Sequence, residues 1–345
     1  MKKSVVKALA LGLCFALSVG ACVGFAGCKE KIPEEEITVY MPDGAPALAL
    51  AGLMHADKED DGVTYRVVAA AQIASKVTNK DEAENADLCV MPVTAASKLL
   101  GSGERYTMLG GVTHGNLFLL KKAEEEPELS VTKENLSELV GKTVGVLQIN
   151  EVPGLTFKAI LNKHGVAWQE LTNGGEAASD KVNLLAITGA DAVGTVAADY
   201  FMIAEPAASA QAKKGYYLVG DLQNLYGGEN GYPQAVLVAK NELVAEYGDW
   251  LADFVEDVRE GAAWLERASG EEIVATVSAH LEDQGATTSL KAPLLKSEVL
   301  ARCAVRFTYA AEMRGRVDTF LEELLAVNDK AAAMPNAAFY WEYQK

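Results

Sequence analysis

The chain has 345 residues, of which half are hydrophobic and 23% are charged. This composition is typical of a folded protein larger than one ordinary domain. Aspartate and glutamate total 48 against 31 lysines and arginines, so the formal net charge is −17. Because phosphates would repel such a surface, this balance excludes nucleic acid as a partner. Beyond the N-terminus no apolar run reaches the ~20 residues that span a bilayer, which excludes a polytopic membrane protein.

The N-terminus has the pattern of an export signal. Lys2, Lys3 and Lys7 precede an apolar stretch over residues 8–27, which ends at Cys28 and a charged run. Residues 25–28, Phe-Ala-Gly-Cys, resemble the processing box of bacterial lipoproteins, in which the cysteine receives a lipid. We therefore expect Cys28 to anchor an extracytoplasmic protein to the cell membrane. A competing box ends at Cys22, and an ordinary cleaved signal or an uncleaved anchor is the alternative.

The chain is predicted to form two lobes after its N-terminal segments. We expect residues 1–27 to be the signal peptide, 28–36 an acidic tether, 37–116 lobe 1, 117–240 lobe 2, and 241–345 a helical return that packs on lobe 1. Only Cys89 and Cys303 then remain as thiols. Both lie in apolar stretches, which favours two buried thiols, with a disulfide as the alternative.

Strand and helix patterns alternate after the tether. Strands are expected at residues 37–41, 65–70 and 87–91, followed by helices at 47–54, after Gln72, and at 95–100. A strand at 117–120 leads into the charged segment 121–128, which we expect to cross between the lobes. A second series opens with a strand at 143–147 and a helix at 154–163. This alternation predicts an α/β fold in which each lobe is a mostly parallel sheet flanked by helices.

Two further patterns support this organisation. Residues 86–97 align without a gap on residues 198–209, as a buried strand that enters a helix, which indicates similar lobes. Residues 250–265 and 313–324 repeat apolar positions at helical spacing, so Trp250, Trp264 and Met313 are assigned to the core.

Motifs of enzymes and metal proteins are missing from the sequence. There is no G-x-S-x-G and no H-E-x-x-H, and the four histidines stand alone. Gly141-Lys142-Thr143 lacks the upstream glycine of a phosphate loop, and no G-x-G-x-x-G follows a strand. We expect no catalytic residue, no metal and no cofactor.

Candidate ligand contacts lie where the predicted strands end. Ligands of open α/β sheets bind beyond the carboxyl ends of the strands, where helix N-termini offer free N–H groups. For any single residue, ordinary helix capping is the alternative. The residues expected to border one cleft are Asp43, Gly44, Ala45, Thr94, Ala95, Thr113, His114, Asn116, Gln148, Asn150, Glu205 and Tyr232.

The order of several segments resembles the solute-binding proteins of ABC importers, in particular the nitrate, sulfonate, taurine and thiamine-precursor binders. The resemblance implies a type II periplasmic-binding-protein fold, two crossings between the lobes, and delivery of a small molecule to an ABC permease and ATPase complex. Carried over by position, the ligand loops fall on Gly44 and Ala45, Thr94 and Ala95, and Glu205. The segments are residues 25–28, 43–47, 86–96, 139–146, 205–207 and 231–236.

The charge pattern favours a neutral or cationic heterocycle as the ligand. Glu205 would accept hydrogen bonds from the N–H groups of the ligand, and Tyr232 would stack on its ring. Most of the eight arginines are expected away from the strand ends, where an anionic ligand would need them. Glu205 capping its own helix is an equally weighted alternative. Two other functions stay open at this point. One is an enzyme that uses Asp43, Asn116 and Glu205 for proton transfer, and the other is a sensor that presents its ligand to a membrane receptor.

Overall fold

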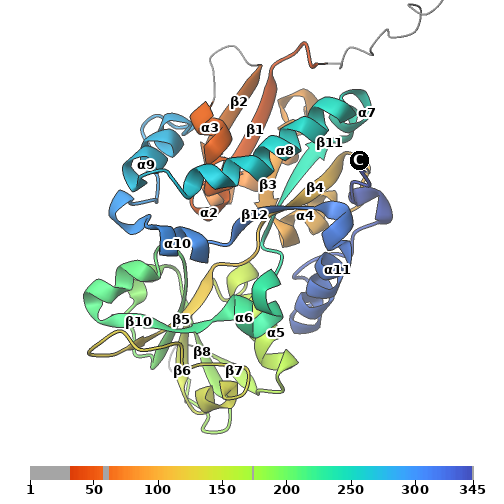
Figure 1. Cartoon of the computed structure of the whole chain (residues 1–345). Coiled ribbons are helices and arrows are strands. Elements are labelled where there is room, and N and C mark those ends of the chain that lie inside the picture. The colour runs from red at the N-terminus through yellow and green to blue at the C-terminus, as the bar shows by residue number, and fades with distance from the viewer. Residues whose placement is uncertain (1–31, 57–61, 173–174, 344–345) are drawn as a thin grey trace, which may run out of the picture. The chain divides into compact units, whose positions relative to one another are not determined.

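The computed structural model describes residues 32–56, 62–172 and 175–343, so the predicted signal peptide and Cys28 lie outside the described residues. Its strands form two six-stranded sheets (Figure 1). We define lobe 1 as the first sheet with its helices and lobe 2 as the second sheet with its helices. The predicted α/β class with two lobes is confirmed.

The sheet of lobe 1 is built around strands that the alternating pattern predicted. Its four parallel-running strands β1 to β4 are joined by β11 and β12, which run in the opposite direction. In spatial order the strands are β12 (Val305–Tyr309), β4 (Tyr106–Thr113), β11 (Ala235–Lys240), β3 (Leu88–Pro92), β1 (Ile37–Pro42) and β2 (Val63–Val68).

The sheet of lobe 2 has five strands that run in one direction and one, β5, that opposes them. In spatial order the strands are β10 (Tyr216–Asp221), β5 (Leu117–Lys122), β9 (Tyr200–Ala204), β6 (Thr143–Leu147), β8 (Val182–Ile187) and β7 (Trp168–Leu171). Both sheets are therefore mostly parallel, as the sequence predicts.

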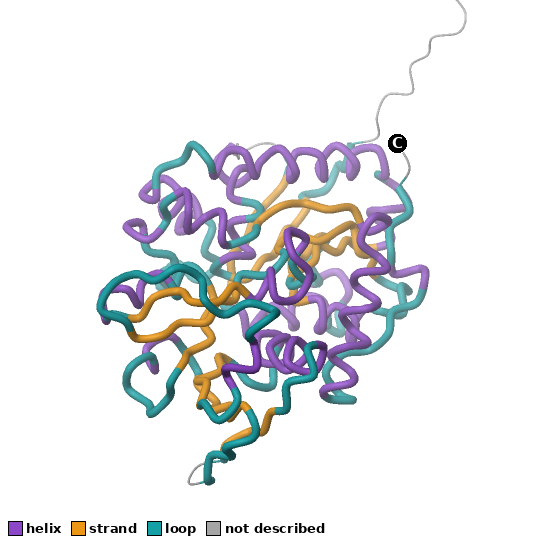
Figure 2. Tube along the Cα trace, turned by 60° about the horizontal axis from the view of Figure 1, so that its bottom comes forward, coloured by secondary structure: helices purple, strands orange, loops and turns teal. Residues whose placement is uncertain are grey.

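Helices pack against the strands of both lobes, and most of them belong to lobe 1 (Figure 2). Lobe 2 holds α5 (Val152–Lys163) and α6 (Leu222–Gly227), followed by the short 3₁₀ turn η6 (Gly228–Asn230). The helices of lobe 1 are α2 (Ala45–Leu48), α3 (Ala51–Ala56), α4 (Val93–Leu100), α7 (Asn241–Glu246), α8 (Gly248–Leu265), α9 (Gly270–Ala279), α10 (Ser297–Arg302) and α11 (Ala310–Val327). Within the described ranges, no helix is both long and apolar enough to cross a membrane.

Each sheet contains a strand that enters directly from the other lobe. The chain leaves β4 at Thr113 and begins β5 of lobe 2 at Leu117, and it later returns through residues 231–234 into β11 of lobe 1. In lobe 2 the entering strand β5 pairs antiparallel with β9, and in lobe 1 the entering strand β11 pairs antiparallel with β3. The aligned segments 86–97 and 198–209 fall on β3 and β9, which therefore hold equivalent places in their sheets.

Two predicted boundaries differ from the structure. Lobe 2 was expected to extend to residue 240, but β11 is hydrogen-bonded between β3 and β4 of lobe 1. The charged segment 121–128 was expected to cross between lobes, but Lys121 and Lys122 end β5, so the crossing is residues 114–116. Among the C-terminal helices, α8 packs against β12 and α11 packs against β4, and α11 also packs against α5 of lobe 2.

The two crossings lie side by side with their backbones in contact. Tyr232 N donates to the His114 carbonyl (3.3 Å) and Gln234 N donates to the Thr113 carbonyl (3.1 Å). A Cβ added to Gly231 would lie 2.0 Å from the His114 carbonyl oxygen, and one added to Gly115 would lie 2.6 Å from the Tyr232 ring. Both glycines also have positive φ, so no other residue fits these positions without a shift of the crossings.

We predict a graded response to alanine at three neighbouring glycines. Gly231→Ala should lower the free energy of unfolding by more than about 2 kcal/mol, because it combines a positive φ with a backbone clash. Gly228→Ala should cost about 1 kcal/mol, because its φ is +66° but its surroundings are open. Gly227 has a negative φ and open surroundings, so Gly227→Ala should stay within about 0.5 kcal/mol. Urea unfolding of the three variants tests this order, and equal losses would contradict the close packing of the crossings.

Candidate functional site

The strand registers bring the carboxyl ends of both sheets to the crossings. Thr113 at the end of β4 lies opposite Ala235, the first residue of β11, and β1 and β3 run parallel to β4. In lobe 2, Leu117 at the start of β5 lies opposite Ala204 at the end of β9, to which β6 and β8 run parallel. The predicted residues at strand ends therefore lie along two sheet edges that meet at the crossings.

In lobe 1, the first-strand loop is closed by its own contacts. Asp43 accepts hydrogen bonds from the Thr288 hydroxyl (2.5 Å) and the Ser289 amide (2.6 Å), so each carboxylate oxygen already has a partner. Gly44 follows with φ +100°, and the four-residue helix α2 begins at Ala45 with Pro46 in its first turn. Asp43 thus fixes the loop over residues 287–290 against the start of α2.

The second predicted loop of lobe 1 starts a longer helix. Helix α4 begins at Val93, whose amide donates to the Gln234 carbonyl (3.0 Å) in the second crossing. Thr94 is buried and Ala95 is half-buried in the first turn. At the end of β4, Thr113 is buried, and its hydroxyl has no hydrogen-bond partner within the described part of the chain.

In lobe 2, the turn after β6 carries two exposed side-chain amides, and one of them belongs to a residue with a strained backbone. Gln148 has φ +47°, and with Ala304 it is one of two non-glycine residues with positive φ in the described ranges. Gln148 and Asn150 are both exposed just before helix α5. Strained residues persist where the surrounding structure fixes them, and they concentrate at functional sites. Gln148 and Asn150 are the predicted contacts of lobe 2 whose side chains are exposed.

Glu205 has internal partners for its whole carboxylate. Its side chain has no exposed surface, and it accepts bonds from the Ser209 amide (2.9 Å), the Ser209 hydroxyl (2.6 Å) and Arg302 Nε (2.7 Å). The structure therefore favours the alternative in which Glu205 caps its own turn. Most of the arginines were expected away from the strand ends, and Arg302 is an exception, since it reaches from lobe 1 to this carboxylate.

The residues predicted within the crossings are structural in this arrangement. Asn116 Nδ2 donates to the Glu205 carbonyl (3.0 Å), and Asn116 Oδ1 accepts from Gln234 Nε2 (3.0 Å), so Asn116 joins both crossings and the end of β9. Tyr232 has no exposed surface and stacks on Phe320 of α11, with the ring centroids 5.6 Å apart. The expectation that Tyr232 stacks on a ligand is therefore not met.

His114 is fully buried beside two arginines. Its Nε2 lies 3.3 Å from the Thr308 hydroxyl. Burial, and then the charges of Arg306 and Arg316, lower the pKa of His114 to about 3. His114 is therefore neutral at physiological pH and does not supply charge to a ligand.

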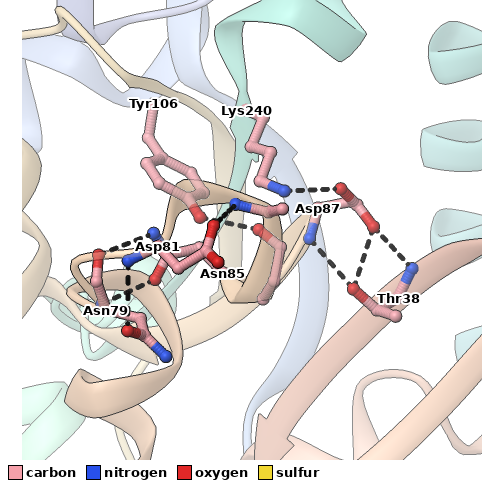
Figure 3. A network of polar contacts seen from close by, with 9 residues as sticks. Thr38, Asn79, Asp81, Asn85, Asp87, Tyr106 and Lys240 are labelled. Atoms are coloured by element: carbon pink, nitrogen blue, oxygen red, sulfur yellow. Dashed lines mark hydrogen bonds and ion pairs between the residues drawn. The ribbon is translucent and has the colours of Figure 1, made fainter.

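A cavity of about 870 Å³ lies at the opposite edge of the first sheet, near the amino ends of β1 and β3. Figure 3 shows the polar network at this edge, in which Asp87 binds the Thr38 amide and hydroxyl and the Lys240 ammonium. Tyr106 donates to the Ala86 carbonyl in the same network. These groups are used in holding strands together, and the cavity contains none of the predicted contacts. Within the described residues, no cluster of histidine, cysteine, aspartate and glutamate could hold a metal ion.

Comparison with known proteins shows the fold. No family model and no curated protein matches the chain. Solved structures do match: an ABC transporter protein from Parabacteroides distasonis is 19% identical, with 90% of this chain and 100% of that chain covered and a TM-score of 0.67. The chain has the fold of ABC-transporter solute-binding proteins. The expected type II two-lobed architecture is thereby confirmed.

Two sulfonate-binding proteins share this fold. The periplasmic aliphatic sulphonate binding protein SsuA from Escherichia coli is 17% identical, with 91% of this chain and 96% of that chain covered and a TM-score of 0.58. The alkanesulfonate-binding protein SsuA from Xanthomonas axonopodis pv. citri, bound to MOPS, is 13% identical, with 90% and 99% covered and a TM-score of 0.56. At these identities the likeness extends to the fold alone.

Sequence reasoning missed Arg302, and it overestimated Glu205 and Tyr232 as ligand contacts. Arg302 is 97 positions from Glu205 and closes a helix, so no local pattern connects the two. The expected buried thiols are confirmed, since Cys89 and Cys303 are both free and buried.

We predict that His114 makes the fold sensitive to acid. The folded pKa is about 3 and the unfolded value is about 6.5. The unfolded chain therefore takes up a proton below pH 6.5 that the folded chain refuses, and stability is lost as the pH falls toward 3. His114→Gln should reduce the loss of unfolding free energy by about 1.4 kcal/mol per pH unit between pH 6 and 4. Urea unfolding across this range tests it, with His55→Gln, at an exposed position, as the control. If the unfolding free energy changed equally with pH in the parent chain, His114→Gln and His55→Gln, a neutral buried His114 would be contradicted.

Proposed function

We propose that this chain is a lipid-anchored extracytoplasmic solute-binding protein that captures a small molecule between its lobes and delivers it to an ABC importer. Three observations support the proposal. The fold is that of ABC-transporter solute-binding proteins, the N-terminal sequence has the pattern of an export signal and resembles a lipoprotein box at Cys28, and the strand ends of both lobes meet at two adjacent crossings.

The meeting of the strand ends carries the proposal. Open α/β sheets bind ligands at the carboxyl ends of their strands, and here two such edges adjoin the same short crossings. Crossings of three and four residues leave two lobes able to rotate about them, which is how binding proteins close on a ligand. Enzymatic proton transfer by Glu205 gains no support, because its carboxylate is buried and paired.

The ligand that this arrangement supports best is neutral and polar. Glu205 and Arg302 cancel each other's charge at the edge of lobe 2, so Glu205 offers no unpaired carboxylate to a cationic ligand. Exposed amides remain at Gln148 and Asn150, and Gly44 and Ala45 lie on the opposing edge. Amides offer both donors and acceptors, which suits the edge of a small heterocycle. We retain a neutral heterocycle as the proposed ligand class and set aside the stacking role of Tyr232.

A ligand screen tests solute binding. Pyrimidines, vitamins, amino acids and sulfonates should be compared by thermal shift, and a true ligand at 100 times its Kd should stabilise the chain by about 2.7 kcal/mol. Gln148→Ala should weaken that ligand roughly tenfold, because it removes a hydrogen-bonding amide. Gln169→Ala, on the outermost strand β7, is the matched control and should leave affinity unchanged. A sulfonate that binds most tightly, with no loss in Gln148→Ala, would overturn the proposed ligand class.

The anchor is tested separately. Cys28→Ser should leave the protein unprocessed or release it from the lipid-modified membrane fraction, because the serine hydroxyl cannot form the thioether. Cys22→Ser is the control, and it should change only the signal segment and leave partitioning intact. Detergent-phase partitioning measures both variants, and an unchanged lipid-modified fraction in Cys28→Ser would refute the anchor.

A further inference from the structure

Three arginines in the C-terminal return reach from lobe 1 to lobe 2. Arg302 ends helix α10, Arg306 lies in strand β12, and Arg316 lies in the second turn of helix α11. Their acceptors are the Glu205 carboxylate and the carbonyls of Glu229 and Asn230, all in lobe 2. We call Arg302, Arg306 and Arg316 the arginine brace.

Arg302 acts on the first crossing through Glu205. Its Nε donates to Glu205 Oε1 (2.7 Å) and its Nη2 donates to the Ser209 hydroxyl (2.8 Å). The Glu205 backbone is in turn fixed to Asn116, since Glu205 N donates to the Asn116 carbonyl (2.8 Å) and the Glu205 carbonyl accepts from Asn116 Nδ2 (3.0 Å). A buried carboxylate is costly without a cationic partner. Separating Arg302 from Glu205 is therefore unfavourable.

Arg306 and Arg316 act on the second crossing. Their Nη2 atoms both donate to the Asn230 carbonyl, at 2.8 Å and 2.6 Å, and Asn230 directly precedes Gly231, the first residue of that crossing. Neither arginine forms an ion pair with a carboxylate in the described part of the chain. Burial lowers the pKa of both arginines, and the charge of Arg316 lowers that of Arg306 further. Two mutually repelling cations are thus held together on one carbonyl oxygen.

The segment between Arg302 and Arg306 is itself tied to the first crossing. The Ala304 carbonyl accepts a hydrogen bond from His114 N (3.1 Å), and Val305 lies opposite Thr113. Ala304 has φ +50°, an unfavourable conformation for alanine. Such a conformation persists only where surrounding contacts hold it. The backbone here is therefore constrained between the contacts of Arg302 and those of Arg306.

We propose that the arginine brace sets the resting angle between the two lobes by holding both crossings from lobe 1. Each crossing has its own arginine contacts, so loss of one contact changes the motion of one crossing first. A change in the resting angle changes the fraction of chains that can close, and hence the apparent affinity for a solute, without any contact to that solute. This consequence for affinity rests on the proposed function, whereas the control of the crossings does not.

Hydrogen–deuterium exchange of the full-length chain in detergent, with no ligand added, tests the brace directly. In Arg302→Gln, amides of residues 114–117 and 203–209 should exchange roughly tenfold faster. In the parent chain, local opening must break the Arg302 contacts, and in this variant that cost is missing. In Arg306→Gln and Arg316→Gln, the faster amides should be those of residues 229–236. Arg267→Gln, at an exposed position after α8, is the matched control and should leave exchange at both crossings as in the parent chain.

Two further measurements distinguish a local effect on the crossings from a general loss of stability. One uses a conservative variant of Arg302, and the other follows amides in the interior of the sheets. Arg302→Lys keeps the charge but cannot make both bonds of the guanidinium, so its exchange should lie between the parent and Arg302→Gln. Amides of β3 and β6, in the sheet interiors, should be unchanged in every variant. Uniformly faster exchange that includes β3 and β6 would show a fold defect and overturn the proposal. Unchanged exchange at both crossings would overturn it as well.

The outcome is independent of whether a solute is found. If the screen yields no ligand while the crossings respond as expected, the proposed function fails and the brace stands. If a ligand binds but the crossings do not respond, the brace fails and the solute-binding function stands. With a ligand from the screen, Arg306→Gln should change its Kd by roughly fivefold or more, whereas Arg267→Gln should not change it.

Discussion

The backbone contact between the two crossings is the constraint on which the rest of the structure depends. Residues 114–116 and 231–234 lie so close that a side chain at Gly231 would overlap the His114 carbonyl. The same contact aligns Thr113 with Ala235 and Leu117 with Ala204, and so fixes where the strands of both sheets end. The proposed site between the lobes depends on these registers, which bring two sets of strand ends to the same crossings.

The charge distribution around the crossings differs from that of the whole chain. The net charge of the chain is −17, yet three of the eight arginines contact acceptors next to the crossings. Only Arg302 is neutralised by a carboxylate there, and the other two are directed at carbonyl oxygens. Carbonyl acceptors hold a guanidinium by direction without cancelling its charge. Arg306 and Arg316 therefore place positive charge beside the second crossing, although the chain as a whole is acidic.

Local patterns in the sequence predicted most elements of the fold but not their long-range pairing. Strands β1, β3 and β6 are short β-branched or apolar runs, which are visible without tertiary information. The continuous helix expected at residues 47–54 is divided into α2 and α3 by a turn at Ala49 and Leu50. Within α3, Gly52 packs against the backbone of Gly261 in α8, where an added Cβ would lie 2.4 Å from the carbonyl oxygen, and no local pattern predicts this contact. Strand β11 looked like the end of lobe 2, since nothing local indicates that residue 235 pairs with residue 92.

The candidate site was predicted at the level of position and less well at the level of role. The expectation that strand ends carry the site placed Gln148 and Asn150 on an exposed edge, because strand direction follows from the alternating pattern. The roles of Glu205 and Tyr232 depended on what else lies nearby. Arg302 binds the Glu205 carboxylate, and Phe320 stacks on the Tyr232 ring. Each partner is about 90 residues or more away in the chain from the group that was expected to face a ligand.

The apolar contacts of α11 limit how the lobes can move. Phe320 of α11 packs against Tyr226 of lobe 2 and Tyr232 of the second crossing, with ring centroids 5.4 Å and 5.6 Å away. Lys163 of α5 pairs with Glu323 of α11 beside them (3.2 Å). Packed aromatic contacts resist separation because each lost contact leaves a void. A rotation between the lobes that preserves them must have its axis close to Phe320 and the crossings. In the proposed closure, residues near that axis would move little, whereas Gln148 and the loop at Asp43, which do not belong to this cluster, would approach or separate.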